Sequence, residues 1–315
     1  MIKKRSRRSA FPEFFVTTNQ IGAFMSLIKK NLVLNSFIAV AAALLCGSAA
    51  HAADWSDTSL SFRTGSQFSE PFNPVDIKKN IFGLTHVSGY KYGSNFFNVD
   101  FLQSDSNDPA SLSQTAGAQE AYLVYRNTID FGKLQGSDIK FGPIRGVGAT
   151  VGFDWNTKND VGYNSRKRML VVGPTLMWDV PGFLNTSVLL LSESNAPSGA
   201  FPPISGVKSR YSYKVHPMLT ANWGIPIAGV ASFEGYANFI ASKGKDEVAN
   251  DTGVETNIDM QVMFDLSSTL GAGKNTFRLG LEYQYWNNKF GNTSLTTFGK
   301  GYKASTPMLR AEYHF

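Results

Sequence analysis

One short motif in the sequence could carry out catalysis. His86-Val87-Ser88 places an imidazole and a hydroxyl two residues apart, which puts both on one face of a β-strand, where a base can activate a nucleophile. Such a pair could hydrolyse a lipid ester. The motif is short, however, and no neighbouring pattern supplies an orienting acid or an oxyanion donor. We therefore expect no enzyme and keep the esterase as an alternative.

A second pattern places aromatic rings beside hydrogen-bonding groups at every other position. Phe96, Asn98 and Asp100 share one strand face, as do Glu234, Tyr236 and Asn238. Stacking surfaces next to polar groups suit a solute with an uncharged aromatic ring and several hydroxyls. The candidate binding residues are Phe96, Asn98, Asp100, Tyr122, Glu234, Tyr236, Asn238, Trp286 and Arg310.

The charged members of this set have an alternative role, since carboxylates and arginines that face one another can form ion pairs that brace a wall. The binding hypothesis therefore rests mainly on the aromatic residues.

The last segment of the chain indicates which elements carry these residues. From Pro307 onward, the odd positions are apolar or aromatic, whereas the even positions hold Met308 followed by the charged or polar residues Arg310, Glu312 and His314. The chain stops on Phe315. Period-two alternation predicts a strand with one apolar face. A strand that ends on a terminal aromatic is typical of an outer-membrane barrel.

Eleven similar segments precede it, so the sequence predicts twelve strands. Their connections alternate strictly between long and short, and both termini lie on the short-turn side. This alternation predicts an all-β, transmembrane, antiparallel β-barrel of about twelve strands with both termini periplasmic. A periplasmic β-sandwich is the alternative fold, but its loops would not sort in this way. Expected bounds include 57–65, 81–92, 95–103, 119–130, 139–155, 210–223 and 230–241.

Residues 1–52 read as a leader and residues 53–315 as the barrel. The apolar run from Leu32 to Ala50 follows Lys29-Lys30 and ends in Ala50-His51-Ala52, a pattern that predicts a secretory signal cleaved before Ala53. An uncleaved anchor is the alternative. Met25 begins a complete signal by itself and is an alternative start of translation.

The composition excludes several classes of protein. A mean hydropathy of −0.15 argues against a helical membrane protein with several spans. The formal charge of +6 belongs almost wholly to the leader, so a nucleic-acid partner is not expected. The single cysteine, Cys46, also lies in the leader, which leaves the exported chain without disulfides. We expect no cofactor and no metal.

Three segments resemble the Tsx-type nucleoside-specific channels. They are Gly280-Leu-Glu-Tyr-Gln-Tyr-Trp-Asn-Asn-Lys-Phe-Gly291, Lys140-Phe-Gly-Pro-Ile144 and Ala311-Glu-Tyr-His-Phe315. The resemblance implies a monomeric twelve-stranded barrel whose narrow lumen passes nucleosides passively. It also implies that phage or colicin could use the barrel as a receptor. It assigns no individual ligand contact.

The expected function is therefore a substrate-selective channel for passive diffusion of small solutes, most of all nucleosides, in the outer membrane of a Gram-negative bacterium. A general porin, in which the lumen aromatics are incidental, is an alternative beside the esterase. The expected partners are outer-membrane lipids, the transported solutes and the barrel-assembly machinery, which would recognise Phe315.

Overall fold

The computed structural model describes residues 53–111, 117–200, 206–207, 209–297 and 299–315. The expected leader and its cleavage site at Ala53 fall almost entirely outside these residues. Helix is limited to α2 (Phe131–Gln135) and the 3₁₀ turns η1 (Pro109–Ser111), η2 (Ser268–Leu270) and η3 (Lys289–Gly291) in the described part. None of these helices has the length and apolarity needed to cross a membrane.

Twelve long strands form the wall, as the alternating pattern predicts. They are β1 (Trp55–Phe68), β2 (Ile77–Tyr90), β3 (Gly93–Ser104), β4 (Gln119–Asp130), β5 (Ile144–Asn159), β6 (Arg168–Trp178), β7 (Phe183–Asn195), β11 (His216–Ala228), β12 (Ala231–Ile240), β13 (Glu255–Asp265), β14 (Phe277–Asn287) and β15 (Lys303–His314). Three strands of two residues each, β8 (Ser198–Gly199), β9 (Gly206–Val207) and β10 (Tyr211–Ser212), belong to the connection between β7 and β11.

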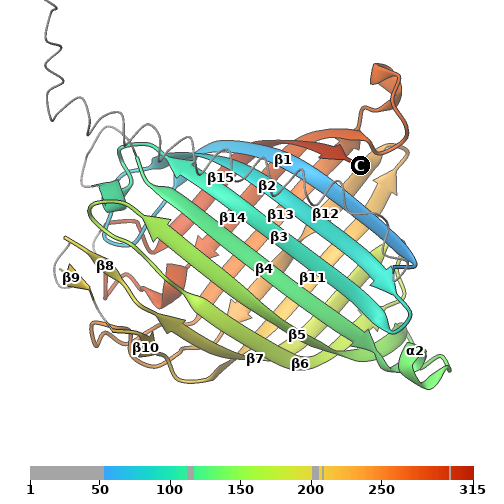
Figure 1. Cartoon of the computed structure of the whole chain (residues 1–315), viewed down its shortest axis with the longest axis horizontal. Helices are drawn as coiled ribbons and strands as arrows, with labels where there is room; N and C mark the ends of the chain where they lie inside the picture. The colour runs from blue at the N-terminus through green and yellow to red at the C-terminus, as the bar shows by residue number, and fades with distance from the viewer. Residues whose placement is uncertain (1–52, 112–116, 201–205, 208, 298) are drawn as a thin grey trace, which may run out of the picture. The chain divides into compact units, whose positions relative to one another are not determined.

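The wall closes on itself (Figure 1). Each long strand pairs antiparallel with the next one, β7 pairs with β11, and β15 returns to pair with β1. This last seam runs from Ser59 opposite His314 to Thr64 opposite Leu309 and stops there. Beyond it β1 has a bulge, where Thr306 Oγ1 donates to the Gln67 carbonyl over 2.8 Å. Closure leaves none of the twelve wall strands with a free edge, so the predicted closed antiparallel barrel is confirmed.

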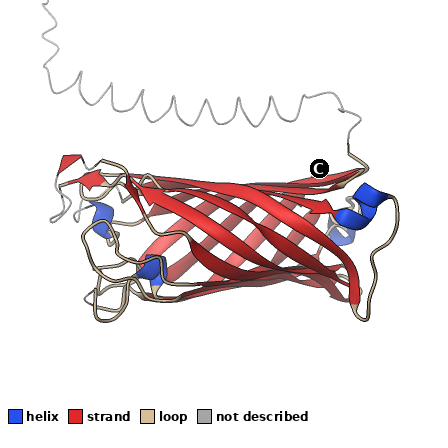
Figure 2. Cartoon of the chain, turned by 90° about the horizontal axis from the view of Figure 1, so that it is seen from below, coloured by secondary structure: helices blue, strands red, loops and turns tan. Residues whose placement is uncertain are grey.

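The connections at one end of the barrel are mostly longer than those at the other (Figures 1 and 2). The predicted strict alternation was wrong, however, because the short-turn connections 131–143 and 266–276 are longer than the long-loop connections 69–76 and 160–167. The long-loop end carries η1, η3 and β8 to β10. The short-turn end carries α2, the start of β1 and the end of β15. The predicted bounds were wrong at several strand ends. β5 begins at Ile144 rather than at residue 139, because Asp130 caps α2 by accepting from the Gly132 amide at 2.9 Å. β11 begins at His216 rather than at residue 210, and β2 begins four residues before its predicted start.

Side chains alternate between the two surfaces of the wall. Along β5, Val151, Phe153 and Trp155 are exposed on the outside, while Gly152 and Asp154 are buried on the inside. Most exposed large apolar side chains of the wall strands lie on the outer surface, as expected of a wall that faces lipid.

The interior also holds two apolar clusters toward the long-loop end. One contains Phe68, Ile77, Ile81 and Met308, and the other contains Val171, Leu189, Leu191 and Met218. Because their strands stand on opposite sides of the ring, the clusters face each other across the barrel.

Candidate functional site

The interior of the barrel brings together the candidate binding residues. All nine occupy the inward alternate positions of β3, β4, β12, β14 and β15, in register with other inward residues. The phase read from the sequence is therefore correct for each of them. Whether they contact a solute stays a prediction.

Arginines and carboxylates form a continuous network along one side of the interior. Arg63 bridges Asp100 on β3 and Glu282 on β14, with an Nη1 to Oε1 distance of 3.3 Å to Glu282. Arg310 pairs with the same Glu282 at 2.8 Å and with Glu312 at 2.6 Å. Asp100 and Arg310 therefore form ion pairs between wall strands, which is the alternative role expected for the charged candidates.

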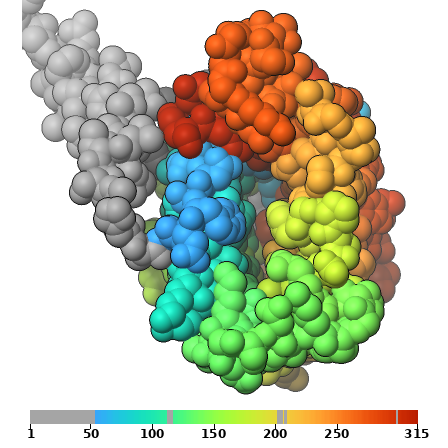
Figure 3. Space-filling model, turned by 90° about the vertical axis from the view of Figure 1, so that its right-hand side faces the viewer, coloured from blue at the N-terminus to red at the C-terminus, as the bar shows by residue number. Residues whose placement is uncertain are grey.

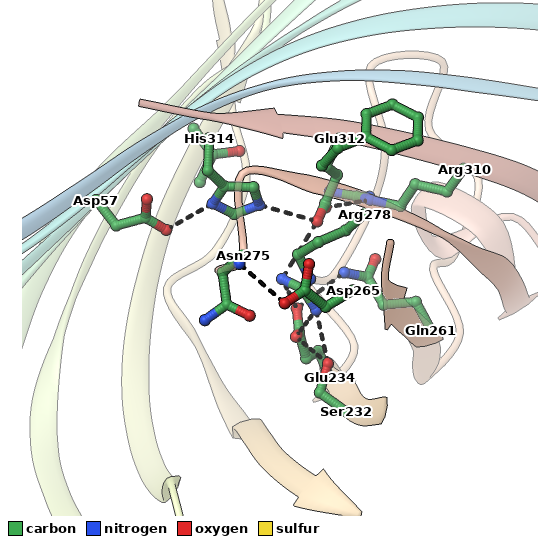
Figure 4. A network of polar contacts seen from close by, with 12 residues as sticks. Asp57, Ser232, Glu234, Gln261, Asp265, Asn275, Arg278, Arg310, Glu312 and His314 are labelled. Atoms are coloured by element: carbon green, nitrogen blue, oxygen red, sulfur yellow. Dashed lines mark hydrogen bonds and ion pairs between the residues drawn. The ribbon is translucent and has the colours of Figure 1, made fainter. Parts of the chain in front are cut away.

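The network continues to the short-turn end (Figure 4). His314 contacts Asp57 through Nδ1 at 2.8 Å and Glu312 through Nε2 at 3.3 Å. Arg278 pairs with Glu312 at 3.3 Å and also with Glu234. Glu234 is therefore neutralised by an arginine, and His314 belongs to an acidic network.

A second group lies on the side formed by β4 and β5. The Tyr122 hydroxyl donates to Asp154 at 2.9 Å, and Arg126 pairs with the same carboxylate. Gly152 makes room for this arginine, because a Cβ there would lie 2.7 Å from Arg126 Cδ.

Among the four aromatic candidates, Phe96 is the most exposed. Phe96 faces the interior a few residues from the short-turn end, yet 38% of its surface is exposed. Tyr236 is half-buried and stands opposite Asp259 of β13. Seen from the short-turn end, the barrel is hollowed at its centre (Figure 3).

Trp286 lies at the opposite, long-loop end, where a turn folds over the interior. Its indole donates to Glu255 at 2.6 Å, and its ring packs edge-on against Phe290 at a centroid distance of 4.9 Å. Lys167 precedes β6, and its ammonium group lies 3.5 Å from the Phe290 ring centroid. Lys167 belongs to the loop between β5 and β6, which stands opposite the loop between β14 and β15 around the ring. Residues 288–292 therefore reach across the mouth. We call them the closing turn.

Buried charges hold the closing turn in place. Glu70 accepts from Lys79 at 2.6 Å and from Lys289 at 3.2 Å, and lies 3.7 Å from Lys158. Lys158 also pairs with Asp108 at 2.8 Å. The mouth cluster, as we name this group, consists of Glu70, Lys79, Asp108, Glu120, Lys158 and Lys289.

The loop members of the mouth cluster have shifted pKa values. Burial lowers the pKa of Lys289 to about 8, although Glu70 opposes the shift. Burial alone would raise the pKa of Glu70, but the ammonium groups of Lys158, Lys289 and Lys79 hold it well below its usual value. The carboxylate is thus the charge on which three ammonium groups converge.

Sequence reasoning missed the mouth cluster, although a signal for it exists. Lys79 and Lys158 occupy inward positions of β2 and β5, and a buried lysine needs a carboxylate partner. A search for lysines on predicted inward faces would have found these two. The position of Glu70 in a loop carries no such signal.

The structure does not assemble the catalytic alternative. His86 lies on the outward face of β2, opposite Thr58, whose Oγ1 is 2.8 Å from His86 Nδ1. Within the described residues His86 has no hydrogen bond to Ser88 or to a carboxylate. No group of histidine, cysteine and carboxylate side chains suited to a metal ion occurs in the same part of the chain.

The fold and the site define a class: a closed twelve-stranded barrel with an apolar outer wall and a charged, aromatic-bearing interior. No model of a known protein family matches the chain, and a comparison with curated proteins finds no match. Among solved structures, the chain is similar to the COG4313 outer membrane channel from Pseudomonas putida F1, with 13% identity, a TM-score of 0.46, and coverage of 85% of this chain and 99% of the other.

Two further structures are similar at the same level. The translocator domain of autotransporter NalP from Neisseria meningitidis has 9% identity and a TM-score of 0.45 over 92% of this chain and 98% of that domain. The KdgM porin has 9% identity and a TM-score of 0.39 over 82% of this chain and 99% of the porin. At such values these similarities carry no argument about function, and the Tsx resemblance stays a prediction.

Proposed function

We propose that this protein is an outer-membrane channel through which small solutes diffuse passively, and that it selects nucleosides. The observation that carries the proposal is the pairing of an apolar outer wall with an interior of ring faces and hydrogen-bonding groups. A membrane requires the first, because a spanning sheet must close and present apolar side chains to lipid. A selective pore requires the second.

The interior suits an uncharged solute better than an ion. Most arginines and carboxylates there already neutralise one another, as Arg63 does with Asp100 and Glu282. A nucleoside can stack on Phe96 or Tyr236 and exchange hydrogen bonds with Asn98 and Asn238 beside them, without breaking an ion pair. Binding of this kind is weak, and passive flux needs release as much as capture.

The proposed orientation follows from the barrel class. Short turns and both termini face the periplasm, and the long loops face outward, as in bacterial outer-membrane barrels generally. The closing turn then covers the outer mouth. Solute entering from outside must displace residues 288–292, so the channel conducts when this turn moves aside.

Uptake by liposomes tests the proposal. The folded protein is reconstituted, and the entry rate of uridine or adenosine is compared with that of sugars of equal size. We expect nucleosides to enter faster at low concentration and to reach saturation. Equal rates for both classes would identify a general porin, and entry of neither would exclude a channel.

A further inference from the structure

Three arginines gather on the outer surface at the long-loop ends of β6 and β7. Arg168 opens β6 on its outward face, opposite Ser194 of β7. Arg210 donates from Nη1 to Ser194 Oγ at 3.1 Å and to the Arg166 carbonyl at 3.0 Å. All three side chains are exposed. We call Arg166, Arg168 and Arg210 the arginine triad.

The triad has no acidic partner in the described part of the chain. None of its members forms an ion pair there, and the charged neighbours that act on Arg210 are Arg168 and Arg166. The inward arginines behave differently, since Arg63, Arg126, Arg278 and Arg310 all pair with carboxylates. The outer surface therefore holds three like charges together, with Arg210 fixed by neutral acceptors, in a geometry that favours an anion.

We infer that the arginine triad binds the phosphate groups of a membrane lipid. Guanidinium groups suit phosphate because their planar donors can bind two oxygens at once. An apolar strip lies next to the triad on the outer surface of β6 and β7. It consists of Leu170, Val172 and Leu190, with 64%, 54% and 54% of their surfaces exposed, and Val172 stands directly opposite Leu190.

A lipid uses both parts of this surface. Its phosphates lie at the level of the arginines, where the wall strands end, and its acyl chains run down the apolar strip. A soluble anion would use only the arginines. The continuity of the two parts is the reason to assign the site to a lipid, because clusters of basic residues at a membrane surface attract anionic headgroups.

Lipid binding to the purified barrel in detergent tests the site. The probe is a phosphorylated glycolipid, and the controls are the same lipid without phosphate and inorganic phosphate alone. The variant Arg166→Gln/Arg168→Gln/Arg210→Gln is compared with Lys133→Gln/Lys140→Gln/Arg145→Gln, which removes the same charge at the short-turn end. Gel mobility before heating verifies that both variants fold.

We expect the triad variant to lose at least roughly tenfold in affinity, since several basic residues together attract anionic headgroups at a membrane surface, while the control variant binds as the wild type does. Equal binding by the two variants, or equal binding of the lipid without phosphate, would overturn the inference. Displacement of the lipid by inorganic phosphate would assign the triad to a soluble anion. The inference rests on the proposed membrane location and not on transport, so a failed uptake assay leaves this result unaffected.

Discussion

Replacing Glu70 by glutamine should open the long-loop mouth. Glu70 is the shared acceptor of Lys79, Lys289 and Lys158, at 2.6, 3.2 and 3.7 Å. Glutamine keeps the size of the side chain but removes its charge. The ammonium groups of Lys79 and Lys158 would then have only Glu120 and Asp108 as acidic partners, and Lys289 would lose its carboxylate partner.

The size of the effect follows from the cost of stranding a buried charge. Removing one partner of a buried ion pair typically costs ~3–5 kcal/mol. Lys158 keeps Asp108 at 2.8 Å, and Lys289 keeps the Ser69 carbonyl at 2.8 Å, so we place the loss at the lower end, about 3 kcal/mol. If closure is a two-state equilibrium, the ratio of open to closed channels rises by roughly a hundredfold.

Single-channel recording in planar bilayers measures this ratio directly. Asp251→Asn is the matched control, because Asp251 forms an exposed ion pair with Lys245 at 2.9 Å in a neighbouring loop, and such pairs contribute little. We expect the Glu70→Gln channel to stay open far longer and the control to behave as the wild type. A Glu70→Gln channel that folds normally and opens no more often would refute the role of the closing turn.

Three further predictions concern pH, selectivity and assembly. Closure of the mouth should weaken as the pH falls below about 4.5, the usual pKa of a glutamate, because the lowered pKa of Glu70 stabilises the closed state fully only above that value. Closure should strengthen as the pH rises from about 8 to about 10.5, because in this range Lys289 has lost its proton in the closed state but keeps it in the open state. Recording the open probability as a function of pH measures both effects. Phe96→Ala/Tyr236→Ala should reduce the nucleoside-to-sugar flux ratio, since stacking on one ring is worth ~1–3 kcal/mol; Phe97→Ala, on the outward face, is the control, and an unchanged ratio would exclude selection by these rings. Deleting Phe315, which is 55% exposed, should lower the amount of protein in outer-membrane fractions measured by immunoblot, whereas normal levels would mean that the terminal ring is not needed for assembly.

The strands and their phase could be predicted because a wall between lipid and an aqueous interior imposes a strict period of two. Leu309 and Arg310 illustrate this, since one must face outward and the other inward whatever the neighbouring strands are. Strand ends were less predictable. At β5 the start depends on the capping of α2 by Asp130, which is a local competition between turn and strand.

The closure of the mouth could not be read from the sequence. Phe290 adopts a left-handed backbone conformation, with φ of 59°, and no local pattern indicates that its ring will lie over Lys167 on the far side of the barrel. Such contacts depend on how loops fold inward after the wall has formed. Trp286 shows the consequence, because its inward phase was predicted correctly whereas its packing against the closing turn was not.

The short seam between β1 and β15 has a consequence for how the barrel forms and fails. Its paired residues, such as Ser59 and His314, lie at opposite ends of the chain, so the loop-closure entropy is the largest of any strand pair in the wall. The ladder ends at Thr64, and Pro307, which has no amide hydrogen to donate, lies just beyond it. We expect β1 and β15 to pair last during insertion and to separate first under mechanical load or heat. Unfolding then begins with the loss of the hydrogen bonds between these two terminal strands.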